Sequence, residues 1–219
     1  MIHRLFPDSI ITVKASPDMW HGEIYPEEQV HVRHAAEKRR QEYTAGRQCC
    51  RKGLETLGIT DFPILPGPHR APLWPTGIIG SISHCEGYCG VAITRAGKIR
   101  GIGFDVEPRS ISNLDPDLIN LICSPAEQKW LAKLSSHQQA HWFKMIFSAK
   151  ESIYKALFPL TRMEFDFLDI DIEFHQKDQS FKIRSSSLTP EQLPNTLLLK
   201  GTYASDSHHV FTATLITHH

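Results

Sequence analysis

The sequence predicts an α+β fold built from two similar subdomains that face each other. Its 219 residues suffice for one large domain or two small ones with a sizeable core. In each half of the chain a helical segment is followed by about three strands, so the order of elements repeats although no sequence repeat is visible. We therefore expect two subdomains, residues 1–104 and residues 105–219, each a helix packed on a roughly three-stranded antiparallel sheet.

In the first half, a short strand at residues 10–13 precedes a helical segment from 27 to 57, which is expected in one or two pieces. This segment carries several arginine and lysine residues, most of which are interpreted as a solvated face. Five prolines then make residues 61–76 an ordered but irregular loop, because proline fixes φ and removes a backbone donor. Three strands follow, at residues 78–84, 88–94 and 99–107.

The second half begins with a helix start. Ser124 is expected as the N-cap, Pro125 at the first helical position, and Glu127 as the residue that closes a capping box. A longer helix is expected from 137 to 158, and its apolar stripe contains Lys150, which must reach solvent or find a partner. Alternating segments then predict strands, at residues 169–174, 181–184, 197–203 and 209–217.

The strand at residues 101–108 lies at the junction of the two halves and carries paired acids. Apolar residues alternate with Asp105 and Glu107, so the two carboxylates share one face of an extended strand. Gly101 and Gly103 lie on the same side and leave room for a neighbour to approach. Like charges held together favour a bound cation, and oxygen ligands suit Mg²⁺. From this stretch alone, a metal site and an edge strand with two solvated acids are equally supported.

Composition and spacing argue against several classes of function. No apolar run reaches about 18 residues and no signal peptide is visible, so a membrane span is not expected. The five cysteines are odd in number and scattered, which predicts reduced thiols and a cytoplasmic protein. The pair Ser83-His84 lacks the Gly-x-Ser-x-Gly turn of a serine hydrolase. His84, Cys85 and Cys89 lack a fourth ligand at a standard zinc spacing.

Two motifs taken together resemble the paired signature of 4′-phosphopantetheinyl transferases. Residues 101–107 (GIGFDVE) are followed about 40 residues later by residues 147–155 (FSAKESIYK). Three earlier motifs resemble the N-terminal motifs of the Sfp-like type, most of all its enterobactin synthase component D branch, namely 42–47 (EYTAGR), 70–75 (RAPLWP) and 80–84 (GSISH). One departure is Phe147, where the family often has tryptophan.

This resemblance implies a reaction and its partners. The 4′-phosphopantetheine arm of coenzyme A would be moved to a serine of an apo acyl, aryl or peptidyl carrier protein, and adenosine 3′,5′-bisphosphate would be released. Such an enzyme would serve nonribosomal peptide, siderophore or polyketide synthesis. The implied fold is a pseudo-dimer within one chain, with coenzyme A in the cleft between its halves. A monomer that binds neither nucleic acid nor membrane is expected.

The resemblance also implies roles for individual residues. Mg²⁺ would be held by Asp105, Glu107 and Glu151, and Glu151 would serve as base for the carrier serine, directly or through a water. Lys155, one helical turn later, would offset charge on the leaving phosphate. The first subdomain would bind the nucleotide end of coenzyme A and the second would hold the metal and catalytic helix. The residues implied in coenzyme A binding are Arg47, Arg70, Ser83, His84, Lys150 and Lys155.

Two other functions remain open at this point. A Mg²⁺-dependent nuclease can also be built from an Asp-x-Glu strand with a later Glu and Lys, but the neutral net charge and pI of about 7.2 lack the basic character of a nucleic-acid-binding surface. A non-catalytic module that binds a nucleotide or a carrier protein is the second alternative. The intact set of three carboxylates and Lys155 argues against it.

Overall fold

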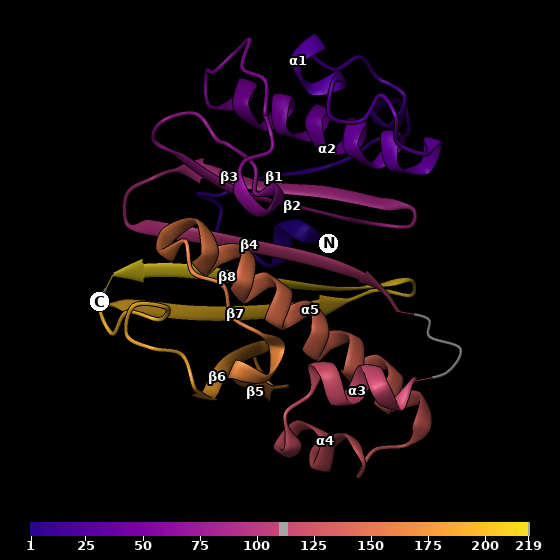
Figure 1. The fold of residues 1–219 in the computed structure, drawn as a ribbon, viewed down its shortest axis with the longest axis vertical. Helices are drawn as coiled ribbons and strands as arrows, with labels where there is room; N and C mark the ends of the chain where they lie inside the picture. Colours follow the sequence, from indigo (N-terminus) through magenta and orange to yellow (C-terminus); the bar gives the residue numbers. More distant parts are fainter. Residues whose placement is uncertain (110–113, 219) are drawn as a thin grey trace.

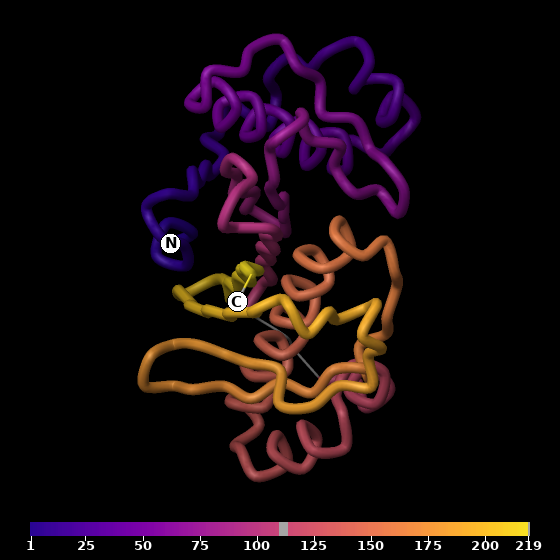
Figure 2. Tube along the Cα trace, turned by 90° about the vertical axis from the view of Figure 1, so that its left-hand side faces the viewer, coloured from indigo at the N-terminus to yellow at the C-terminus, as the bar shows by residue number. Residues whose placement is uncertain are grey.

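The computed structural model describes residues 1–109 and 114–218, which form two antiparallel sheets with one long helix on each (Figure 1). Seen from the side, the chain forms an upper part from the first half and a lower part from the second half (Figure 2). In the described residues, no helix is both long enough and apolar enough to cross a membrane. All five cysteines are free thiols.

The first sheet has three strands in the order β1-β3-β2, namely β1 (Ile11–Lys14), β2 (Ile78–Cys85) and β3 (Tyr88–Arg95). Helix α2 (Glu37–Thr56) covers it, and the short helix α1 (Pro26–Gln29) precedes α2, so the predicted helical segment is indeed in two pieces. Cys49 and Leu54 of α2 pack against Val91 and Ile93 of β3 in a buried cluster. The residues that the structure describes also include four 3₁₀ segments, at Ile2–Arg4, Pro17–Trp20, Pro68–Arg70 and Phe167–Asp169.

The second sheet has five strands in the order β4-β8-β7-β6-β5. Helix α5 (Ser136–Thr161) packs across it, and α3 (Pro116–Ile122) and α4 (Pro125–Leu131) lie near one end of α5 (Figure 1). The predicted capping box is present at the start of α4, between Ser124 and Glu127. The strands are β4 (Ile99–Pro108), β5 (Ile170–His175), β6 (Ser180–Ser186), β7 (Leu197–Ser205) and β8 (His209–His218).

The predicted fold class is confirmed, but the second sheet is larger than the three strands expected. The second half supplies four strands, and the fifth is β4, which follows the β2–β3 hairpin in sequence yet pairs along its length with β8, Asp105 lying opposite Thr212. The proposed boundary between residues 104 and 105 thus falls inside β4. This strand is the seam between the two halves, because its other edge faces β2 (Figure 1).

Two serines of β2 join the halves along that edge. The Oγ of Ser81 accepts a hydrogen bond from the backbone nitrogen of Phe104 at 2.9 Å, and the Oγ of Ser83 accepts one from Val106 at 3.3 Å. Side-chain hydroxyls therefore satisfy donors that would otherwise be unpaired in the interior.

The glycines of β4 leave room for helix α5 rather than for a ligand. A Cβ at Gly103 would lie 1.7 Å from the carbonyl oxygen of Ser152, and one at Gly101 would lie 2.6 Å from that of Ala156. The backbones of strand and helix are thus in direct contact. Since Glu151 immediately precedes Ser152, this contact sets how the motif on α5 meets the acids of β4.

Candidate active site

A cavity of about 730 Å³ lies between the two halves of the chain. The first half lines it with residues of α2, the proline-rich loop and β2, and the second half lines it with residues of α5. Five of the residues predicted for the site line this cavity together, namely Arg47, Arg70, His84, Glu151 and Lys155.

Asp105 is buried where the two halves meet. Its Oδ1 accepts hydrogen bonds from Lys155 Nζ at 2.6 Å and from Ser83 Oγ at 2.9 Å, and the same ammonium donates to Ser83 Oγ at 3.1 Å. The other oxygen, Oδ2, is buried and has no hydrogen-bond partner within the described part of the chain. A buried carboxylate oxygen without a donor is costly, so this atom is suited to a cation.

The other two carboxylates of the motif carry raised pKa values. Burial raises the pKa of Glu107, the charge of Asp105 adds to the effect, and Lys144, 3.0 Å from Glu107, opposes it. Burial also raises the pKa of Glu151, which Lys155 opposes and the other two acids reinforce. Burial would lower the pKa of Lys155, but the carboxylates of Asp105 and Glu151 outweigh it and the pKa is raised.

The three carboxylates influence one another but do not form a ready three-ligand group. Among residues 1–109 and 114–218, no three His, Cys, Asp or Glu side chains lie close enough to hold one metal ion. Two lysine ammonium groups neutralise carboxylates of this set, because Lys155 forms an ion pair with Asp105 and Lys144 forms one with Glu107. The donor set nevertheless suits a hard ion, since it offers only oxygens, one of them unpaired.

Cavity-lining side chains of the first half form contacts with other protein groups. Arg47 donates from Nε to the carbonyl of Ile64 at 2.7 Å, and its guanidinium lies 3.9 Å from the ring centre of Tyr43. His84 lies 2.9 Å from a guanidinium nitrogen of Arg39, measured from Nε2, and burial lowers its pKa. These contacts orient flat cationic and imidazole groups along one wall of the cavity.

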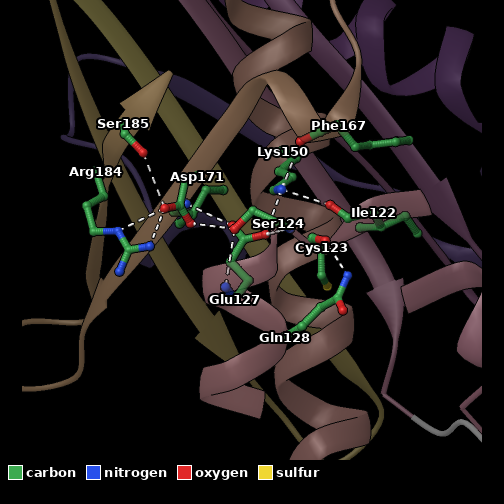
Figure 3. Close-up of polar contacts among 11 residues, drawn as sticks. Ile122, Cys123, Ser124, Glu127, Gln128, Lys150, Phe167, Asp171, Arg184 and Ser185 are labelled. Atoms are coloured by element: carbon green, nitrogen blue, oxygen red, sulfur yellow. Dashed lines mark hydrogen bonds and ion pairs between the residues drawn. The ribbon is translucent and has the colours of Figure 1, made fainter. Parts of the chain in front are cut away.

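Two predicted cofactor-binding residues are not placed in the cavity. Lys150 is 1% exposed, and its ammonium donates to Glu127 and to the carbonyls of Ile122 and Phe167, each at 2.8 Å (Figure 3). All three of its protons are used, so the structure gives no support to a phosphate contact. Ser83 does not line the cavity either, and its hydroxyl forms hydrogen bonds with Asp105 and Lys155.

Sequence reasoning missed Arg39 and Lys144, which contact site residues. The helical spacing of both residues indicates that they lie near motif residues. Arg39 precedes Arg47 by eight residues and Lys144 precedes Glu151 by seven, so each lies on the same helix face as a motif residue.

Replacement of Ser83 by alanine tests the hydrogen bonds that this serine forms between β2 and β4. We expect a loss of about 1–3 kcal/mol in the free energy of unfolding, because Val106 and the Asp105–Lys155 pair lose a buried partner. Equilibrium denaturation measures it. The matched control is Ser187→Ala, since this exposed serine also bonds to an aspartate, and it should change stability by less than about 0.5 kcal/mol. Equal effects of the two substitutions would contradict the buried role of Ser83.

Both sides of the cleft match known families. Residues 27–94 match the 4′-phosphopantetheinyl transferase N-terminal domain, and residues 101–212 match the 4′-phosphopantetheinyl transferase superfamily. The chain belongs to the 4′-phosphopantetheinyl transferase family. The resemblance seen in the sequence motifs is thereby confirmed, and this transferase is an enzyme of the class predicted.

Several curated relatives resemble this transferase over most of its length. The 4′-phosphopantetheinyl transferase Svp of Streptomyces mobaraensis is 37% identical over 188 residues, which cover 84% of this chain and 76% of the relative. The 4′-phosphopantetheinyl transferase PptT of Mycobacterium tuberculosis is 34% identical over 175 residues, 76% of each chain. Enterobactin synthase component D of Escherichia coli (strain K12) is 33% identical over 148 residues, 68% of each chain.

Proposed function

We propose that this transferase moves the 4′-phosphopantetheine group of coenzyme A to a serine hydroxyl of an apo carrier protein, with Mg²⁺ as cofactor. The observation that carries the proposal is the cavity between the halves, which has arginines and histidines on one wall and Glu151 and Lys155 on the other. This division of charge suits a ligand whose phosphates lie against the cationic wall and whose reacting bond lies near Glu151 and Lys155.

The nucleotide end of coenzyme A would lie along the first half. Arg47, Arg70 and His84 line the cavity there, and Arg39 lines it beside them. A guanidinium binds phosphate through two parallel hydrogen bonds, so these residues are the proposed contacts. Lys155 would meet the phosphates from the opposite wall, and neither Lys150 nor Ser83 is included.

Asp105, Glu107 and Glu151 are the proposed holders of Mg²⁺. The fit is supported by the unpaired Oδ2 of Asp105 and by the pKa values of the two glutamates, which burial and, to a smaller extent, the neighbouring carboxylates raise. A bound cation would stabilise the charged form of these groups. When bound, the ion would neutralise charge on the pyrophosphate and on the leaving group.

Glu151 is the proposed base. Asp105 and Glu107 are each paired with a lysine, whereas the ion pairs found in the described part of the chain include none to Glu151. A carboxylate with a raised pKa accepts a proton more readily than an ordinary one. Lys155 would stabilise negative charge that develops on the leaving phosphate.

The carrier protein would dock beside α3. The segment 108–124 is the proposed lip of this site, and its residues 110–113 lie outside the described residues. Leu118 and Leu121 of α3 are 45% and 61% exposed. Two exposed leucines suit an apolar contact with the helix that presents the acceptor serine.

The biosynthetic role rests on the relatives. The likeness to enterobactin synthase component D supports a carrier of nonribosomal peptide or siderophore synthesis, and a polyketide carrier is the other proposed substrate. We propose a cytoplasmic monomer, consistent with five free thiols and with a site completed by the two halves of one chain.

Intact-protein mass spectrometry tests the reaction. Incubation with coenzyme A, Mg²⁺ and an apo peptidyl carrier protein is expected to raise the carrier mass by one phosphopantetheine group. Addition of EDTA should stop the transfer and excess Mg²⁺ should restore it. A carrier whose serine is replaced by alanine is the control. If none of several apo acyl, aryl and peptidyl carriers gains mass, the proposal fails.

A further inference from the structure

A second polar network lies beside the catalytic helix and is not used by the mechanism above. At its centre Lys150 and Glu127, both almost fully buried, form an ion pair at 2.8 Å (Figure 3). The network continues from Ser124 to Asp171, which accepts hydrogen bonds from Arg184 at the molecular surface.

Lys150 ties three segments to helix α5. Its ammonium reaches Glu127 at the start of α4, the carbonyl of Ile122 at the end of α3, and the carbonyl of Phe167 after α5. These contacts use its full hydrogen-bonding capacity. Lys150 directly precedes Glu151, so these contacts start from the residue next to that carboxylate.

Glu127 extends the same connection. Its Oε1 accepts a hydrogen bond from the backbone of Ile172 at 2.8 Å, and its Oε2 accepts one from Ser124 at 2.7 Å. Burial raises the pKa of Glu127, and Lys150 opposes that rise. The pair therefore links α4, α5 and strand β5 through one buried carboxylate.

The hydrogen bond from Lys150 to the carbonyl of Phe167 holds a segment that faces Glu151 across a cavity. A second cavity of about 280 Å³ is lined by Glu151 and Tyr154 on one side and by residues 164–167 on the other. Glu151 and Tyr154 also line the large cavity, so Glu151 stands between the two. The position of residues 164–167 determines how closely this side of Glu151 is enclosed.

We infer that Lys150 and Glu127 are positioning residues, which hold Glu151 and the facing segment 164–167 in the arrangement needed for transfer. The inference rests on the proposed role of Glu151. A buried ion pair contributes little to stability compared with a well-packed apolar substitute, so stability alone gives no reason for one here. Its geometric effect is specific, because three acceptors in fixed places allow one rotation of this part of α5.

The variant Glu127→Gln/Lys150→Met tests the inference without leaving a charge buried. Because the tie is lost, turnover with an apo carrier is expected to fall about 10–100-fold, the range found when groups that orient catalytic residues are removed. The dissociation constant for coenzyme A should stay within about twofold, because the walls that bind its nucleotide come from other elements. The single variant Lys150→Met should lower turnover at least as much.

The matched control is Arg184→Met, which breaks the outer end of the same network and leaves every contact of Lys150 in place. Its turnover should remain within about twofold of wild type. Hydrogen exchange of residues 164–172 gives a readout that needs no catalysis. It should be faster in the double variant than in wild type and control, while exchange in the β2–β3 hairpin stays unchanged.

The inference would be overturned by turnover of the double variant within about twofold of wild type, by an equal loss in the control, or by unchanged exchange of residues 164–172. A parallel loss of coenzyme A binding would also overturn it, since the whole cleft would then depend on the pair. If the wild-type protein transfers nothing, the proposed function fails, and the exchange measurement still decides whether Lys150 holds the segment.

Discussion

Replacement of Glu151 by glutamine is expected to lower the rate of phosphopantetheine transfer by at least ~100-fold, the scale of general base catalysis, while coenzyme A still binds. Glutamine keeps the shape of the side chain but cannot take the proton of the acceptor serine. The turnover rate by mass spectrometry and the dissociation constant for coenzyme A by calorimetry measure the two effects separately.

The control for this substitution is Glu55→Gln, which removes the same charge from an exposed position on α2. It should leave both quantities unchanged. Near-normal turnover of the Glu151 variant would refute the role assigned to this carboxylate. Loss of coenzyme A binding together with turnover would instead indicate a structural role, and would leave the base unidentified.

Replacement of Gly103 by alanine is expected to destabilise the protein by about 3 kcal/mol or more, at the upper end for overpacked interiors. The added Cβ would lie 1.7 Å from the main-chain oxygen of Ser152, so no side-chain rotation can relieve the overlap and α5 must move. For a chain of this size each 1 kcal/mol lowers the melting temperature by about 2–4 °C.

Gly97→Ala provides the matched control, because a Cβ at Gly97 meets no atom within 4 Å. Its unfolding free energy should differ from wild type by less than about 0.5 kcal/mol. Calorimetry or denaturant titration compares the two variants. A Gly103 variant as stable as the Gly97 variant would contradict the direct contact between β4 and α5.

Much of the fold was accessible from local patterns. Alternation predicted the strands of the second half, helical spacing predicted α2 and α5, and the capping box at Ser124 was found where expected. The helix α3 was not predicted. The strand order was also inaccessible, since β4 pairs with β8, more than 100 residues later, instead of joining the hairpin that precedes it.

The sequence motifs predicted which residues would belong to the site, but not what those residues contact. The motifs named Asp105, Glu151 and Lys155, and the structure places the last two in one cavity with an ion pair from Lys155 to Asp105. The partners of Ser83 and Lys150 were not foreseen. Lys150 was recognised as a charge within an apolar stripe that needed a partner, but nothing near it in sequence indicated Glu127.

The sequence by itself determined which side chains share a face, because the periods of strand and helix are local properties of the chain. It thereby placed Asp105 with Glu107, and Glu151 one turn before Lys155. Only the tertiary structure decided what each of these faces meets. The contact of Gly103 with α5, the serine seam to β2 and the burial of Lys150 against Glu127 all depend on packing between distant segments, and no local period encodes that packing.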